Sequence, residues 1–316
     1  MSGCGESKRK ELVQDAPLIS LKVVDAFGDT VSFPRPPRRI VSLTPNQTEL
    51  IFQLGAENKL KARSETSTTP ERVRTYPVVR TQPALDTEYL QELQPDCILV
   101  TRELFEKADS MRLFFRQMGV PVLVQQFQDL EDFYRNTLQL GKLTKRREPS
   151  QLFVTAYRSL MDSLQARTEK KSLYSSIFIL QFDPLTVIGG KHFVNDIAQV
   201  VTTRNVYAGR NVPYLVADRD SVMKKKPEFI FIPLSDDPNQ LQELIALYPE
   251  FGVLPAVQQG RVFQIDMEKL MLPGPNTLYT VLELAQALHP EANPNELFGK
   301  IFMAQQEEQA PPQPNP

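Results

Sequence analysis

The feature that most constrains the fold is a long, uninterrupted helical pattern near the middle of the chain. In residues 149–170, apolar side chains recur at helical spacing, at Leu152, Phe153, Ala156, Tyr157, Leu160, Met161 and Leu164. Because neither glycine nor proline follows Pro149 in this run, we expect a single helix of about 20 residues and about 30 Å. A helix of this length predicts a rigid connector between two lobes.

The chain before this helix alternates between strands and helices. Buried strands are expected at residues 39–43, 60–62, 96–100 and 120–124, and helices at 46–54, 88–93 and 108–118. A small hairpin at residues 18–33 and a proline-rich step precede them. This alternation predicts a parallel sheet with helices on both faces.

The alternation restarts after the connector. Extended segments are expected at residues 176–180, 185–188, 228–232 and 261–265, and helices at 194–201, 220–225, 239–247, 277–289 and 295–306. One pattern occurs twice, at residues 89–99 and 221–231, as a short helix, a proline, an acidic residue and a buried strand. A repeat on either side of a long helix predicts two similar lobes.

The predicted fold class is therefore α/β, with two Rossmann-like lobes joined by one long connector helix. The predicted divisions are a tether at residues 1–17, an N-terminal lobe at 18–146, the connector at 147–170, a C-terminal lobe at 171–302 and a disordered, proline-rich tail at 303–316.

The composition excludes several classes of function. A formal net charge of -2 gives no basic footprint for nucleic acid. The two cysteines, Cys4 and Cys97, cannot build a disulfide framework or a zinc–thiolate site, and the two histidines, His192 and His289, are too few for a free-metal receptor. Because no glycine-rich nucleotide motif or serine elbow occurs, we predict a protein that is not an enzyme.

Candidate ligand-binding residues follow the expected strands. Ligands of open α/β sheets bind beyond the carboxyl ends of the strands, so two facing lobes are expected to share a cleft. The predicted ligand-binding residues are Asn46, Gln47, Ser64, Arg102, Phe182, His192, Phe193 and Tyr214. Aromatic walls with a few polar anchors suit a broad planar ligand, and the imidazole of His192 is a candidate ligand for a metal ion held by such a molecule. No resident metal or cofactor is predicted.

Short motifs in a fixed order resemble the helical-backbone class of substrate-binding proteins of ABC importers. The resemblance covers residues 20–300 and is carried by Ser42-Leu43-Thr44-Pro45-Asn46-Gln47-Thr48-Glu49, Leu93-Gln94-Pro95-Asp96, Gly189-Gly190-Lys191, Pro255-Ala256-Val257 and Pro273-Gly274-Pro275. It implies capture of a metal chelate outside the cytoplasm, with a preference for cobalamin or another corrinoid. The alternative within the class is a ferric siderophore or haem, and a more distant one is an interaction module without a ligand.

The resemblance also implies partners and a location. In this class an acidic residue on each lobe pairs with arginines of the permease dimer, and Glu88 and Asp220 occupy these two places, the second of which more often holds glutamate. The start of the chain resembles the end of a bacterial lipoprotein signal, with Cys4 as the lipidated residue. The protein is therefore expected in the periplasm or at the cell surface, in contact with the membrane only through a lipid anchor.

Overall fold

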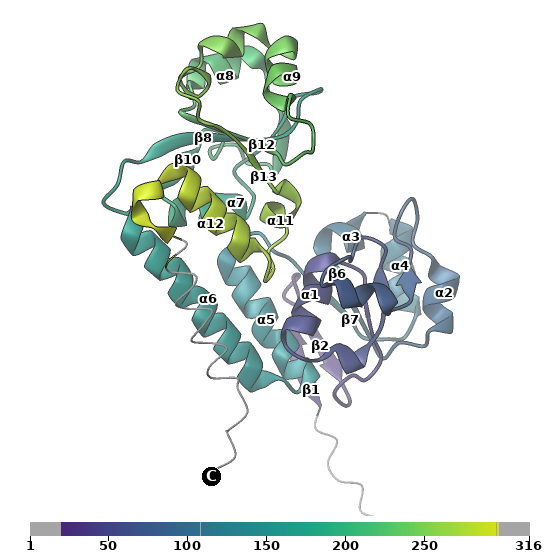
Figure 1. Cartoon of the computed structure of the whole chain (residues 1–316). Coiled ribbons are helices and arrows are strands. Elements are labelled where there is room, and N and C mark those ends of the chain that lie inside the picture. Colours follow the sequence, from purple (N-terminus) through teal and green to yellow (C-terminus); the bar gives the residue numbers. More distant parts are fainter. Residues whose placement is uncertain (1–19, 108, 295, 297–316) are drawn as a thin grey trace, which may run out of the picture.

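The computed structural model describes residues 20–107, 109–294 and 296. The predicted tether with Cys4, the predicted tail and nearly all of the helix predicted at residues 295–306 lie outside these residues. Within them, the chain forms two α/β lobes joined by a helical segment (Figure 1). The predicted fold class is confirmed.

The N-terminal lobe is built on a parallel sheet of five strands in the order β5-β4-β3-β6-β7. Its strands are β3 (Ile40–Ser42), β4 (Leu60–Ser64), β5 (Val78–Val79), β6 (Cys97–Thr101) and β7 (Val122–Gln125). The helices are α1 (Pro45–Gln53), α2 (Thr87–Glu92), α3 (Arg102–Glu106) and α4 (Asp109–Gln117). The predicted hairpin is formed by β1 (Leu21–Val24) and β2 (Thr30–Phe33), which pair antiparallel.

Successive residues of the central strands enter different cores. In β6, Cys97 and Leu99 join a core under α1, whereas Ile98 and Val100 join a second core under α2, α3 and α4. This pattern explains why the strand reads as a continuous apolar run, because both of its faces are buried.

The C-terminal lobe contains a mixed sheet, which differs from the first lobe. Its strands are β8 (Tyr174–Gln181), β9 (Thr186–Ile188), β10 (Thr203–Asn205), β11 (Tyr214–Val216), β12 (Phe229–Pro233) and β13 (Val262–Ile265). The order is β11-β9-β8-β12-β13, with β10 also on β8, and β9 runs antiparallel to both of its neighbours. The helices are α7 (Val194–Val200), α8 (Arg219–Lys225), α9 (Gln240–Leu247), α10 (Pro255–Gln258), α11 (Met267–Met271) and α12 (Thr277–Leu288).

The connector is a pair of helices, and its first member was not predicted. Helix α5 (Leu130–Thr144) runs back alongside α6 (Arg147–Thr168), which is the 22-residue connector itself (Figure 1). The turn between them is tight because Gly141 lets the helices touch: a Cβ atom there would lie 2.0 Å from Oγ of Ser150.

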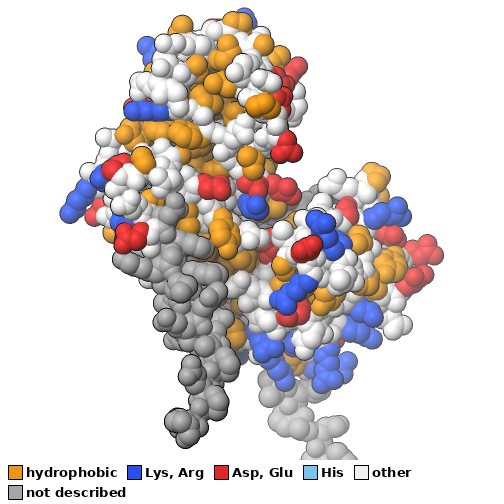
Figure 2. All heavy atoms as spheres, viewed as in Figure 1, with side chains coloured by type: hydrophobic (Ala, Val, Ile, Leu, Met, Phe, Trp, Pro, Cys, Tyr) orange, Lys and Arg blue, Asp and Glu red, His pale blue; other side chains and the backbone are white. Residues whose placement is uncertain are grey.

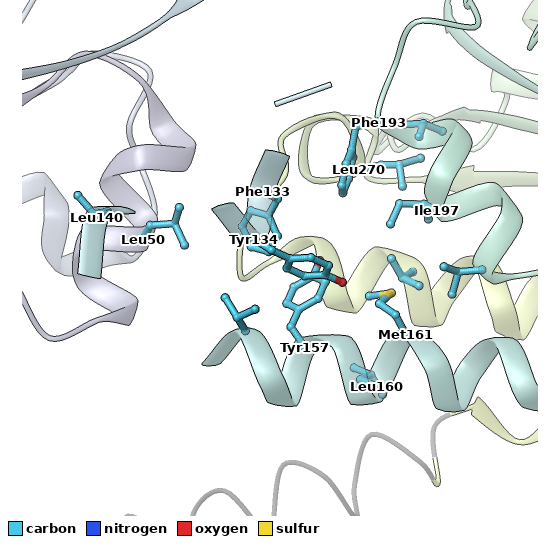
Figure 3. Close-up of a cluster of buried hydrophobic side chains, with 14 of the residues drawn as sticks. Leu50, Phe133, Tyr134, Leu140, Tyr157, Leu160, Met161, Phe193, Ile197 and Leu270 are labelled. Carbon is cyan, nitrogen blue, oxygen red and sulfur yellow. The ribbon is translucent and has the colours of Figure 1, made fainter. Parts of the chain in front are cut away.

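One hydrophobic core runs through both lobes and this helical pair. It includes Leu50 of α1, Phe133 of α5, Tyr157 of α6, Phe193 before α7 and Leu270 of α11 (Figure 3). The lobes are therefore packed onto the connector as well as tethered by it.

Candidate functional site

The two lobes face each other across a notch at the carboxyl ends of the N-terminal sheet. A space-filling view shows this hollow between the lobes, with acidic side chains gathered on its upper wall (Figure 2). A hydrogen bond between the lobes crosses it: Asn276 Nδ2 donates to Oε1 of Glu49 over 2.8 Å. The amide of Leu130, at the start of α5 in the connector pair, donates to Oδ2 of Asp196 in the C-terminal lobe over 2.9 Å.

A cavity of about 180 Å³ lies at the floor of this notch. Its N-terminal wall comes from the first turns of α1 and from the loop after β4, and its C-terminal wall from α11 and the loop before α12. The lining residues are Pro45, Asn46, Glu49, Thr66, Thr68, Thr69, Asp266, Glu268, Lys269, Leu272 and Asn276. Ligand pockets for whole small molecules usually have about 300–1,000 Å³, so this cavity has the size of a subsite.

Glu49 is the central polar residue of the cavity. It accepts hydrogen bonds from Thr69 of its own lobe and from Asn276 of the other. Gly274 leaves room for the carboxylate, because a Cβ atom there would lie 2.8 Å from Oε2 of Glu49. Burial raises the pKa of Glu49, and these hydrogen bonds and the charge of Lys269 offset part of the rise.

His192 and Tyr214 form a second polar group on the C-terminal side of the notch. His192 Nε2 lies 3.1 Å from the Tyr214 hydroxyl, and Nδ1 accepts a hydrogen bond from the Val194 amide. Burial lowers the pKa of His192 to about 4, so the ring is neutral with its proton on Nε2. Burial and the nearby Glu103 carboxylate of α3 raise the pKa of Tyr214.

Arg102 opens α3 and is held by its own lobe. Its Nε donates to Glu106 over 3.2 Å, its Nη1 donates to Gln126 over 3.4 Å, and its guanidinium lies 4.8 Å from the centre of the Phe27 ring. The positive charge is therefore partnered by a carboxylate, and its side chain is already positioned by three neighbours.

Two predicted ligand-binding residues of the N-terminal lobe, Gln47 and Ser64, lie inside the protein, which corrects their expected placement. Gln47 is fully buried and donates to Gln125 and to the Val100 carbonyl, so it ties α1 to β6 and β7. Ser64 is also fully buried, in a hydroxyl network with Thr66 and Ser67.

The predicted ligand-binding residues Phe193 and Phe182 pack into hydrophobic cores. Phe193 is fully buried in the core that joins the lobes. Phe182 packs at the edge of the separate core under α8 and α9, and its carbonyl accepts a 2.7 Å hydrogen bond from the Tyr248 hydroxyl. Neither ring therefore faces the cavity.

The structure thus brings only part of the predicted set to the notch. Asn46 lines the cavity, and the pair of His192 and Tyr214 lies outside it, with Glu103 of the N-terminal lobe near Tyr214. Arg102 is held on its own lobe by Phe27, Glu106 and Gln126. Sequence reasoning missed Glu49, Lys269 and Asn276. The signal for Glu49 was present, because the motif that ends in Glu49 and the motif around Gly274 meet across the lobes.

The two predicted docking acids are exposed and lie far from this cavity. Glu88 is in the first turn of α2, and Asp220 is in the first turn of α8, where Asp218 is occupied as the N-cap of the helix. Figure 1 shows α8 at the outer end of the upper lobe and α2 at the outer end of the other.

Two further searches covered the described residues. No group of three or more histidine, cysteine, aspartate or glutamate side chains there is arranged to hold a metal ion. No helix in the same part of the chain is both long and apolar enough to cross a bilayer.

Comparisons with known proteins give a consistent result. The chain is 24% identical to the vitamin B12-binding protein of Vibrio vulnificus over 251 residues, which covers 79% of this chain and 90% of that protein. It is also 24% identical to YvrC of Bacillus subtilis, described as an uncharacterized ABC transporter substrate-binding lipoprotein, over 92% of this chain and 93% of the relative.

Two solved structures have the same fold. The periplasmic vitamin B12 binding protein BtuF of Vibrio cholerae matches with a TM-score of 0.70 and 23% identity, over 82% of this chain and 99% of that one. The periplasmic heme binding protein HutB of the same species also matches with a TM-score of 0.70, at 22% identity over 80% of this chain and 99% of that one.

The family model for periplasmic binding proteins matches residues 40–268, which include both lobes and the connector. The chain belongs to the periplasmic binding protein family, whose members here are substrate-binding proteins of ABC transporters.

Proposed function

We propose that this protein captures a corrinoid of the vitamin B12 type outside the cytoplasm and delivers it to the permease of an ABC importer. The relatives named for vitamin B12 support the ligand class. The choice of a corrinoid over other metal chelates rests on the charge of the notch between the lobes.

Carboxylates outnumber available cations in this notch. Lys269, the cation among the residues that line the cavity, is paired with Asp266 at 2.7 Å. Glu49 and Glu268 add further negative charge around the same cavity. A ligand with carboxylate groups would meet uncompensated repulsion there, whereas a corrinoid with neutral amide arms would not.

Haem is the alternative ligand that the residues near the notch allow us to compare with a corrinoid. Tyr214 and His192 are neighbouring side chains of the two types, tyrosinate and histidine, that both occur as haem ligands. His192 already uses Nδ1 and Nε2 in hydrogen bonds. This use of both ring nitrogens favours the corrinoid over haem.

Delivery requires contact with the membrane. We assign docking on the permease to Glu88 and Asp220, which are exposed at the outer ends of the two lobes. Each exposed ion pair would stabilise the complex with the permease only slightly, but two pairs far apart would fix its orientation. We assign the membrane anchor to a lipid on Cys4. Replacement of Cys4 by serine is expected to release the protein from membranes in fractionated cells.

A thermal-shift panel tests the ligand class. Cyanocobalamin, haem, a ferric hydroxamate and a ferric catecholate are each added to the purified chain at concentrations well above micromolar. A ligand that binds only the folded state raises the melting temperature, and we expect this for cyanocobalamin. A shift with haem or a siderophore and none with cyanocobalamin would reject the corrinoid, and no shift with any probe would favour an interaction module.

A further inference from the structure

The small cavity between the lobes is lined by an amide N–H that no described residue accepts. Asn46 is 4% exposed and lines the cavity. Its Oδ1 accepts from the Gln47 amide at 3.0 Å, and because a backbone N–H can only donate, this bond fixes which side-chain atom is oxygen. Among the described residues no group accepts from its Nδ2, and this atom is not one of the fully buried atoms that lack a partner, so it is open to the cavity.

Glu49 lies one helical turn further along α1, on the same side of the helix. The side chains of Thr69 and Asn276 both donate to its Oε1. A carboxylate offers about four acceptor positions over two oxygens, so Glu49 retains capacity to accept. Glu268 lines the opposite wall with a second carboxylate. Lys269 is paired with Asp266, so the cavity presents the N–H of Asn46 beside the carboxylates of Glu49 and Glu268.

We propose that this cavity is a subsite for a primary carboxamide arm of the ligand. The carbonyl oxygen of the arm accepts from Nδ2 of Asn46, and its NH₂ group donates to Glu49 and Glu268. The volume of about 180 Å³ fits a short arm and not a macrocycle. This inference rests on the proposed function, because corrinoids carry such arms around the ring.

Other arms fit the same groups less well. A carboxylate has no donor for Glu49 and is repelled by two like charges. An ammonium group has no acceptor for Asn46. A hydroxyl group is a single heavy atom and does not reach two partners that are one helical turn apart, about 5–6 Å between Cβ atoms.

The test uses matched corrinoids on the full chain. Calorimetric titration compares cyanocobalamin with its monocarboxylic acid derivatives, in each of which one peripheral amide is hydrolysed. We expect one of these derivatives to bind about tenfold or more weakly, since it loses hydrogen bonds to charged groups. The other derivatives are expected to bind nearly as well as the parent compound.

Variants assign the discrimination to the cavity. Glu49→Gln is expected to reduce the loss of affinity for that one derivative. Asn46→Ala is expected to lower the affinity for cyanocobalamin toward that for the derivative. Glu243→Gln, on the exposed side of α9, is the matched control and should change neither value. The ratio of two affinities within one variant does not depend on how much of that variant is folded.

The outcomes separate this inference from the function on which it rests. Equal binding of the parent and all derivatives to the unmodified protein would overturn the carboxamide subsite and keep the corrinoid ligand. A discriminated derivative whose penalty survives in Glu49→Gln would place the subsite elsewhere. No binding of any corrinoid would overturn both proposals.

Discussion

At the scale of single residues, the polar side chains around the notch divide into those that support it and those that face it. Gln47 and Ser64 are buried, and their side chains bond Gln125 and Ser67, respectively, inside the N-terminal lobe. Asn46, one position before Gln47, lines the cavity. Adjacent residues of one helix turn thus have different roles, because successive helical positions point about 100° apart.

This division predicts that Gln47 affects stability before it affects binding. Gln47→Ala leaves Gln125 and Thr44 without their partner. We therefore expect a loss of about 1–3 kcal/mol in the free energy of unfolding, measured by urea denaturation. Gln53→Ala, on the exposed side of the same helix, is the control and should stay within about 0.5 kcal/mol. Similar losses for the two variants would contradict the supporting role.

His192 predicts a specific dependence of stability on pH. Its pKa falls from 6.5 to about 4 in the folded protein through burial. Between these values the unfolded chain binds the proton and the folded chain does not, so stability is lost as pH decreases through this window. Relative to His192→Gln, the unmodified protein should lose stability from pH 6.5 to 4 and then level off. The comparison matters because burial also lowers the pKa of His289. A constant difference between the two proteins across this range would show that His192 does not titrate as described.

The sequence indicated which loops border the site better than it indicated which side chains of those loops face it. Asn46 lines the cavity, whereas Gln47, Ser64, Phe182 and Phe193 are taken up by packing or internal hydrogen bonds. The rule that ligands bind beyond strand ends selects a loop. It does not say which of two adjacent side chains faces outward, since that depends on contacts from distant parts of the chain.

At the scale of elements, the strand and helix pattern was largely recoverable because each buried strand is an apolar run between helix signals. The connector was predicted within two residues of its observed start at Arg147. Helix α5 was missed although it has 15 residues, and nine of them are buried, including Asp132 and Asn136. The antiparallel β9 was predicted only as an extended segment, because strand direction is set by pairing with β8 and β11.

The contact between α5 and α6 gives a test at this scale. Gly141→Ala would place a Cβ atom 2.0 Å from Oγ of Ser150 and 2.8 Å from the Arg146 carbonyl. Overpacking of this kind costs about 1–3 kcal/mol, and we expect a loss of this size in chemical denaturation. Gly209→Ala is the control, since no atom lies within 4 Å of its added Cβ. Tolerance of both substitutions would mean that the helical pair is not closely packed at this turn.

At the scale of the whole molecule, the shared core limits how far the lobes can move. Residues from α1, α5, α6, α7 and α11 belong to one buried cluster. Close-packed interiors deform little, so we expect only a small hinge motion on ligand binding. Small-angle scattering should therefore give nearly the same radius of gyration with and without cyanocobalamin. A large closure would show that the core separates.

The separation of the docking acids from the cavity predicts that binding and transport can be uncoupled. The double variant Glu88→Ala with Asp220→Ala should bind cyanocobalamin normally, because neither acid lines the notch. Uptake through the importer should be abolished. Glu243→Ala with Glu92→Ala removes two other exposed acids and should leave uptake intact. Normal uptake by the first pair would remove the docking assignment.

The central claim is that the protein carries a corrinoid, and its absorption spectrum after gentle purification from the organism that makes it tests this most directly. Corrinoids, haem and ferric siderophores absorb in clearly different ways, and no assumption about the cavity is needed. We predict a corrinoid spectrum that disappears when the protein is unfolded and dialysed. A haem or ferric siderophore spectrum would contradict the account.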